Sequence, residues 1–200
     1  MTSRRSNQNK VTLFLVGMTV FTLLMTFYAG PRVMAMREDV RSRHVFYKCI
    51  KIVSGDTIQV QLRGWDRPNT NSLFEVKLAG VEAPPLAAAD DPALVAWARE
   101  RGIDPAWASR IAASSQEALS AFLRRQNLML ESADGTEIDP TVTGQIEAHA
   151  YVFGVDAGDK QLENGLVLLR PDAPQRHAAE YAKTVERAKT RNAGLYRATP

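Results

Sequence analysis

The order of short strands and helices in this sequence predicts an α+β fold, a small closed β-barrel with helices packed outside it. Short segments in which apolar and polar residues alternate between turn residues are typical of half-buried strands. Two further segments open with Asp-Pro and place apolar residues at helical spacing, which is typical of capped amphipathic helices. The apolar fraction of 45% and the charged fraction of 24% are those of a globular protein and exclude a disordered chain.

Local chemistry predicts where each element begins and ends. Ser54-Gly55-Asp56 has the composition of a tight turn and joins the first two strands as a hairpin. Asp91-Pro92 and Asp104-Pro105 each provide a capping carboxylate and a first-turn proline. The expected strands span residues 45–53, 57–62, 74–81, 128–131 and 145–155, and the expected helices span 91–102, 104–125 and 178–192, with a short helix or turn at 162–169.

An uncharged apolar run, VTLFLVGMTVFTLLMTFYA, occupies residues 11–29. Its length matches the ~20 residues that an α-helix needs to cross a bilayer, and it exceeds the about 7–15 apolar residues of a cleaved signal peptide. Tyr28 stands where an interfacial aromatic residue belongs. The expected organisation is a short polar tail at 1–10, one transmembrane helix at 11–29, a juxtamembrane stalk at 30–44 and a folded domain at 45–200.

Charge alone does not orient this anchor. Lys and Arg residues are nearly balanced on its two sides, so the positive-inside rule does not separate the alternatives. A short tail followed by a large domain favours a single-pass protein with a cytoplasmic N-terminus and an extracytoplasmic domain, periplasmic in a bacterium. The formal net charge of +3 admits nucleic acid or an anionic membrane surface as a partner and argues for neither.

Four motifs occur in a fixed order along residues 45–197. They are Gly55-Asp56-Thr57, Leu78-Ala79-Gly80-Val81-Glu82-Ala83-Pro84, Ala150-Tyr151-Val152 and Ala193-Gly194-Leu195-Tyr196. In this order and spacing they resemble the motifs of the staphylococcal nuclease (thermonuclease) family. The resemblance implies a five-stranded barrel of the oligonucleotide-binding (OB) type with helices packed on it, preceded here by the transmembrane helix.

Members of that family hydrolyse phosphodiesters by in-line attack of water. A divalent cation and two arginines neutralise the charge that develops on phosphorus, and a glutamate activates the water. The resemblance places Asp56 and Glu82 at the two metal-ligand positions, with Glu82 as a longer carboxylate in place of an aspartate. It therefore implies no required cofactor and at most a weak Ca²⁺ site at Asp56 and Glu82.

Four other positions of this site carry residues that do not suit the chemistry. Ser54 replaces an acidic residue, Lys77 replaces the first arginine, Pro85 replaces the general-base glutamate and Glu147 replaces the second arginine. A missing base costs on the order of 10²–10⁴ in rate, and a missing electrostatic donor about 10²–10³ more. We interpret the nearby His149 as a core or surface histidine, not as a substitute base. The sequence therefore predicts no catalytic residue and no efficient nuclease activity.

The leading interpretation is a catalytically inactive domain, held at the membrane, that acts as an accessory or scaffolding subunit among other membrane-protein subunits. One alternative is an active membrane-anchored, metal-dependent nuclease in which Asp56, Glu82 or Glu147 binds the metal. Another is a nucleic-acid-binding module without catalysis. Stacking aromatic residues and a clear basic stripe are not evident in the sequence, so nucleic acid is not the expected partner.

The helical segment at 86–112 is an insertion, longer than the corresponding family loop. It contains Trp97 and Trp107, and tryptophan is enriched at the hot spots of protein interfaces. We expect these two side chains to contact a partner of the complex, together with the anchor helix. The alternative is that both tryptophans cover one end of the barrel.

The intact chain is expected to remain in the membrane pellet after carbonate washing. The reason is that residues 11–29 carry no charge and no small-x-small cleavage site follows them. Immunoblotting of the pellet and the supernatant measures the result. A soluble form that begins near Gly30 or Met36 would contradict this prediction.

Overall fold

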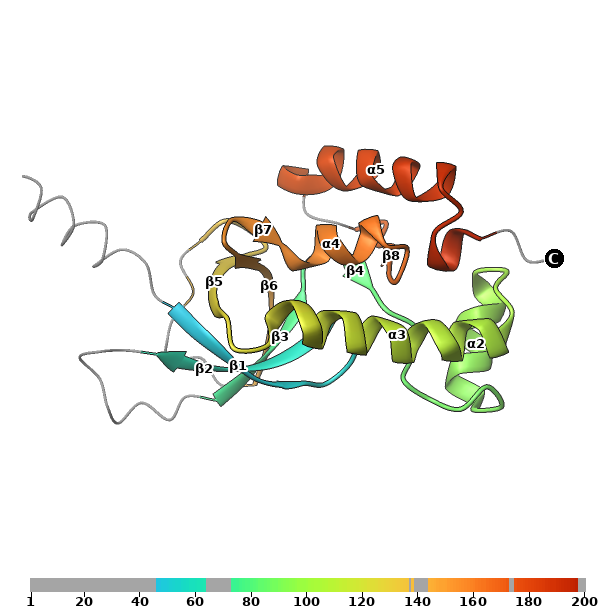
Figure 1. Ribbon diagram of the computed structural model, residues 1–200, viewed down its shortest axis with the longest axis horizontal. Coiled ribbons are helices and arrows are strands. Elements are labelled where there is room, and N and C mark those ends of the chain that lie inside the picture. Colours follow the sequence, from blue (N-terminus) through green and yellow to red (C-terminus); the bar gives the residue numbers. More distant parts are fainter. Residues whose placement is uncertain (1–45, 64–72, 137, 139–143, 173–174, 198–200) are drawn as a thin grey trace, which may run out of the picture. The chain divides into compact units, whose positions relative to one another are not determined.

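The structure, a computed structural model, describes residues 46–63, 73–136, 138, 144–172 and 175–197 (Figure 1). These residues belong to the folded unit that begins at Val45. The expected transmembrane helix at 11–29 and the stalk at 30–44 lie outside the described residues. Within the described part, no helix combines the length and the apolar character needed to cross a membrane.

Five strands close into a mixed β-barrel. Neighbouring strands pair in antiparallel fashion in the order β3-β2-β1-β5-β6, and the parallel pairing of β3 with β6 closes the ring, with Lys77 opposite Glu147. This confirms the expected small α+β barrel. The strands are β1 (Phe46–Ile52), β2 (Thr57–Arg63), β3 (Leu73–Leu78), β5 (Asn127–Ser132) and β6 (Gln145–Val152).

Alternate residues of the strands fill the barrel interior. On β3, Phe74, Val76 and Leu78 are buried, and the residues between them face outward. Tyr47 on β1 packs edge-on against Phe74, with 5.7 Å between the ring centroids. This period of two matches the alternating sequence, because a strand points successive side chains to opposite faces.

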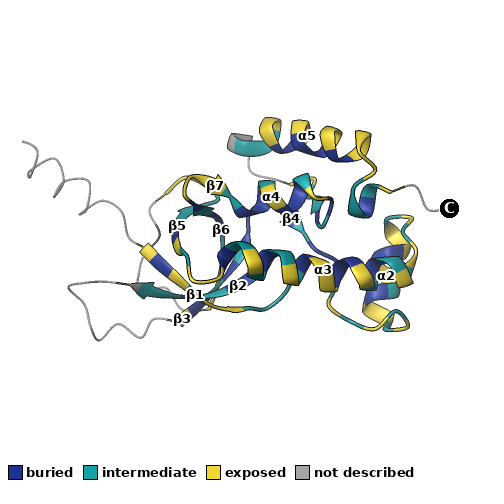
Figure 2. Cartoon of the chain, in the orientation of Figure 1, coloured by how far each residue is buried: buried dark blue, intermediate teal, exposed yellow. Residues whose placement is uncertain are grey.

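Four helices within the described residues pack outside the barrel, and in Figure 2 their buried residues form stripes with exposed residues on the other side. As expected, Asp91 and Asp104 cap the first two of these helices. Their carboxylates accept hydrogen bonds from Ala93 N and Trp107 N, both at 2.8 Å. The helices are α2 (Pro92–Glu100), α3 (Pro105–Leu123), α4 (Ala157–Glu163) and α5 (Gln175–Thr190), followed by a 3₁₀-helix, η1 (Gly194–Tyr196).

A second apolar cluster lies beside α2 and α3, apart from the barrel core. The insertion therefore has a small core of its own, which is closed by η1. The buried members of this cluster are Leu94, Trp97, Ala98, Ala108, Ile111 and Leu195.

The third expected strand is divided in two. The sequence predicts a strand over residues 74–81, but β3 ends at Leu78 and the chain turns at Gly80, which has a φ of 72°. The next two residues form β4 (Val81–Glu82), which pairs with β8 (Leu168–Leu169) in a separate two-stranded sheet. The turn matters because it directs Glu82 away from the barrel.

The segment after β6 also differs from the expectation of one strand over residues 145–155 and a helix or turn at 162–169. Phe153 and Gly154 have φ values of 50° and 81°, so the chain reverses into the short strand β7 (Val155–Asp156). Asp156 then caps α4, which begins at Ala157. The helix therefore lies earlier than predicted, because the capping aspartate was read as part of the strand.

Two glycines meet where the end of α4 contacts η1. Leu195 N donates a hydrogen bond of 2.7 Å to Gly165 O. A Cβ atom on Gly165 would lie 2.2 Å from Ala193 O, and one on Gly194 would lie 2.1 Å from Gly165 O. Both residues also have positive φ, so this contact requires glycine on each side.

Gly165→Ala is expected to destabilise the domain by roughly 2–4 kcal/mol, because the added methyl group meets backbone atoms that cannot move aside. Gly102→Ala is the matched control. Gly102 has a similar φ of 63° and nothing within 4 Å of the added atom, so it should lose only the left-handed penalty of about 1–2 kcal/mol. Denaturant unfolding followed by circular dichroism measures both variants, and equal losses would contradict the steric argument.

Candidate functional site

Asp56 lies in the turn between β1 and β2, where the resemblance places a metal ligand. The turn is closed by Val53 N and Ser54 N, which donate to Thr57 O at 2.9 and 3.1 Å. The carboxylate of Asp56 is buried, and its Oδ1 accepts hydrogen bonds from Ser54 Oγ at 2.6 Å and Thr57 Oγ1 at 3.0 Å. Its Oδ2 accepts a hydrogen bond from Ala83 N at 3.1 Å. Asp56 thus ties the β1–β2 turn to the segment that follows β4.

Glu82, the second residue at a metal-ligand position, is directed toward α2. Its Oε1 accepts a hydrogen bond from Trp97 Nε1 at 2.9 Å, and its Oε2 forms an ion pair with Arg101 Nη2 at 2.8 Å. The Arg101 guanidinium also lies over the Trp97 ring, 4.7 Å from its centroid. Both carboxylate oxygens of Glu82 therefore join β4 to the helical insertion.

Glu147 on β6 is held by a residue that the sequence analysis did not single out. Its Oε1 accepts hydrogen bonds from Arg170 Nη1 at 3.0 Å and from Gly80 N at 3.3 Å. Arg170 follows β8 and makes a second ion pair, with Asp172. The hydrogen bonds that Arg170 donates to Asp172, together with the charges of Glu147 and Asp172, raise the pKa of the Arg170 guanidinium.

Lys77 adds a second cation to this group. It lies opposite Glu147 in the β3–β6 pairing. The pKa of Asp172 is lowered first by its hydrogen bond with Arg170 and to a smaller extent by the charge of Lys77. A guanidinium is therefore present near the position where the resemblance places the second arginine, but it comes from the residue after β8 and is already paired with two carboxylates.

The predicted site residues therefore belong to three separate hydrogen-bonded groups, centred on Asp56, Glu82 and Glu147. Ser54 serves Asp56 as a hydrogen-bond donor, and Pro85 has no side-chain polar group. No group of three or more His, Cys, Asp or Glu side chains within the described ranges is arranged to hold a metal ion. A cation at Asp56 and Glu82 would compete with hydrogen bonds that connect the barrel to α2.

The two tryptophans of the insertion differ in their surroundings. Trp97 belongs to the second apolar cluster and is 7% exposed. Trp107 is only partly buried, and its Nε1 donates a hydrogen bond of 3.2 Å to Gly194 O. The guanidinium groups of Arg110 and Arg197 lie 4.9 and 6.0 Å from the centroid of the Trp107 ring. Trp107 therefore offers more surface to a partner than Trp97 does.

A buried polar network on the outer side of β6 was not predicted. His149 is 1% exposed, and its Nδ1 lies 2.9 Å from Asp156 Oδ2. Tyr181 on α5 donates to the same oxygen at 3.0 Å. Burial, followed by the charge of Asp156, raises the pKa of Tyr181 above its ordinary value. Two features of the sequence could have indicated this network: Asp156 stands at a position that can cap a helix, and His149 stands at an outward-facing position of the strand.

The same network contains a polar atom without a partner. Nδ1 of His149 faces both the Asp156 carboxylate and the Tyr181 hydroxyl, so this nitrogen makes the contacts of the ring with the network. Nε2 is buried and has no hydrogen-bond partner. The His177 ring lies 4.2 Å from the His149 ring, centroid to centroid. His149 is a core histidine, which agrees with one of the two interpretations made from the sequence.

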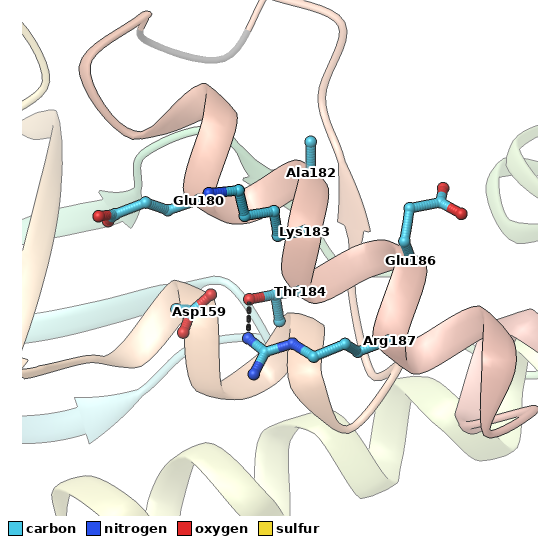
Figure 3. Close-up of a pocket in the computed structure, with 7 residues that line it drawn as sticks. All are labelled: Asp159, Glu180, Ala182, Lys183, Thr184, Glu186 and Arg187. Atoms are coloured by element: carbon cyan, nitrogen blue, oxygen red, sulfur yellow. Dashed lines mark hydrogen bonds between the residues drawn. The ribbon is translucent and has the colours of Figure 1, made fainter.

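One hollow on the surface lies over α5 and does not include the residues discussed so far. It has a volume of about 800 Å³, and Figure 3 shows Arg187 Nη2 donating to Thr184 Oγ1 within it, at 2.8 Å. Its charged side chains are of both signs, so it shows no preference for an ion of either charge. It is lined by Asp159, Glu180, Ala182, Lys183, Thr184, Glu186 and Arg187.

Comparison of the chain with models of known protein families and with curated proteins finds no match. The thermonuclease resemblance therefore stays a prediction that depends on the four motifs. The barrel itself is fixed by its strand order and its pairing.

Tyr181→Phe is expected to destabilise the domain by about 1.5–3 kcal/mol, because it removes a hydrogen bond to the charged Asp156 carboxylate. Tyr196→Phe is the matched control. Burial raises the pKa of Tyr196 to about 12, but its hydroxyl bonds to the neutral backbone of Leu169, so the expected loss is only about 0.5–1.5 kcal/mol. Thermal and denaturant unfolding measure both variants, and a larger loss for Tyr196→Phe would contradict the role given to Asp156.

Proposed function

We propose that this chain is a membrane-anchored, thermonuclease-like domain without catalytic activity, which serves as an accessory or scaffolding subunit of a larger membrane complex. The observation that carries the proposal is the state of the three carboxylates at nuclease-like positions. Asp56, Glu82 and Glu147 each accept hydrogen bonds or ion pairs from groups of the same domain. A phosphodiesterase instead needs carboxylates that are open to a cation and a water molecule.

The barrel supports the family part of the proposal. Five strands close through a parallel β3–β6 pair, and helices pack outside, which fits an OB-type barrel. The motif Gly55-Asp56-Thr57 forms the first hairpin turn, and the segment 78–84 follows β3 toward the same turn. Ala83 N, in that second motif, donates to Asp56 in the first. The two motifs are therefore joined by a hydrogen bond, as parts of one site would be.

The electrostatics around Glu147 argue against turnover. A substrate phosphate would have to approach Glu147 and Asp172, and both carboxylates are negatively charged. Releasing Arg170 to meet the phosphate would leave these carboxylates without their ion pairs, and partly buried pairs are costly to break from one side. Lys77 remains, but a single ammonium does not provide the bidentate contact of an arginine.

A scaffolding role fits the helical insertion. Its tryptophans and arginines connect α2 and α3 to β4 and η1, so the insertion is a rigid part of the domain. Trp107 with Arg110 and Arg197 offers a partly exposed aromatic ring and two cations on one surface. This is the composition found at interface hot spots, and it makes Trp107 the stronger candidate contact.

The full chain, purified in mild detergent, is expected to show no Ca²⁺-dependent cleavage of single-stranded DNA or RNA above background, because the base position holds Pro85 and Glu147 is closed by Arg170. A fluorogenic substrate measures the rate. Asp56→Ala is the control, since contaminating nuclease would persist in that variant. Cleavage that disappears in Asp56→Ala would show that the domain is an active nuclease.

The double variant Pro85→Glu with Glu147→Arg tests the family resemblance from the opposite direction. Trace activity in that variant alone would support a nuclease-like ancestry for the site.

Fluorescence anisotropy with labelled single-stranded DNA tests the remaining alternative, a nucleic-acid-binding module without catalysis. Tight binding that Lys77→Ala abolishes would favour a nucleic-acid-binding module and contradict the scaffolding proposal.

A further inference from the structure

One outer face of the barrel exposes large apolar side chains in neighbouring strands. Phe46 on β1 lies directly opposite Met129 on β5, and Met129 lies opposite Tyr151 on β6. Residues paired in this way project from the same face of a sheet. Phe46 and Met129 are both exposed. Most exposed strand residues of a soluble barrel are polar, so two adjacent apolar residues at this place require an explanation.

Phe153 continues this face at the tip of the β6–β7 turn. It is 92% exposed, the largest value among the exposed large apolar residues of the described chain. Its φ of 50°, with 81° at Gly154, is the pattern of a type I′ turn, where Asn-Gly is preferred and a bulky aromatic residue is unfavourable. A phenylalanine here benefits neither the turn nor the core. Its position is therefore best explained by a contact outside the domain.

Basic residues lie at one end of this apolar face. Lys48 pairs with Asn127 two residues along from the Phe46–Met129 pair and therefore on the same face, and it is exposed. Arg124 and Arg125 are exposed and directly precede β5. Adjacent strands lie about 4.8 Å apart and successive residues about 3.3 Å along a strand. The cations at this end of β1 and β5 therefore stand within a few side-chain lengths of the apolar residues.

We propose that this apolar face, made of Phe46, Met129 and Phe153 with Lys48, Arg124 and Arg125 beside it, docks onto the lipid surface of the membrane. The inference rests on the proposed membrane anchor. Apolar side chains surrounded by Lys and Arg suit the boundary between anionic head groups and acyl chains. The sequence favours a lipid surface as the occupant, because only residues 30–45 separate Phe46 from the apolar run at 11–29.

The short tether makes a small docking surface sufficient. Residues 30–44 span at most about 50 Å when fully extended, so β1 cannot move far from the bilayer. Docking is then an intramolecular step, for which the effective concentration is in the mM range. Three apolar and three basic side chains would be too few to hold a free protein on a membrane. They are enough to orient a domain that is already tethered there.

The test uses the full chain in nanodiscs that contain anionic lipid, with Cys49→Ala to remove the only cysteine. A nitroxide label on Met129→Cys reports on the apolar face, and a label on Leu86→Cys is the control. Met129 and Leu86 are both exposed, at 36% and 49%, but Leu86 lies between β4 and α2. Collision of each label with oxygen and with a water-soluble nickel chelate measures its depth.

The label at residue 129 is expected to be protected from nickel and accessible to oxygen, while the label at residue 86 remains fully accessible to nickel. Phe153→Asn should lower the ratio of docked to undocked protein roughly tenfold, since it removes one buried phenylalanine. The same variant should leave thermal stability unchanged or higher, because Asn-Gly suits the turn. A structural role for Phe153 would instead lower stability.

Three results would overturn the docking proposal. A label at 129 that is as accessible to nickel as the label at 86 means that the membrane does not cover the face. Spin–spin broadening that disappears on dilution with unlabelled chain means that a second copy covers it. Protection that is equal in purely zwitterionic lipid removes the role given to the three cations. Failure of the chain to float with lipid at all would instead refute the anchor, and flotation is measured first.

Discussion

The Asp156 carboxylate is the interaction on which the arrangement of the C-terminal half depends. Its Oδ1 accepts from Gly158 N at 2.6 Å and from Asp159 N at 3.2 Å, which caps α4. Its Oδ2 faces His149 on β6 and Tyr181 on α5. One side chain thus connects a barrel strand and two helices. Because charged, buried hydrogen bonds are strong only when every partner is present, this network also fixes where β6 must end and where α5 must lie.

The same principle governs the positions that resemble a nuclease site. Glu82 is bonded by Trp97 and Arg101, and Glu147 is bonded by Arg170. Both carboxylates, on β4 and β6, instead connect a strand to an element outside the barrel. Each is paired with a cation of the same domain, which weakens the local field that phosphoryl transfer requires. Catalysis requires carboxylates that are open to a cation and a water molecule, whereas stability of the fold is served by carboxylates bonded within the domain. Here the carboxylates are bonded within the domain.

The sequence predicted the elements whose signals are local. Alternation identified the barrel strands, and Asp-Pro pairs located the starts of α2 and α3, because both signals lie within a few residues of the feature they specify. It did not predict that Arg170 would meet Glu147, since 23 residues separate them and only the β4–β8 pairing brings them together. The Asp156 network was missed for a related reason. Val155-Asp156 continues an apolar run, and the reversal at Phe153 is not typical of an aromatic residue.

The region around β4 and α2 and the β6–β7 turn differ in how well their side chains are accommodated by the fold. On the side of β4 and α2, polar groups are paired internally and the tryptophans are partly or wholly covered. At the β6–β7 turn the opposite holds, because Phe153 has an unfavourable backbone conformation and almost no contact with the fold. Folding alone would select against such a residue, since a smaller polar side chain would stabilise both the turn and the exposed surface. The docking proposal accounts for this residue, because a membrane surface at the β6–β7 turn would cover the aromatic side chain that the fold leaves exposed.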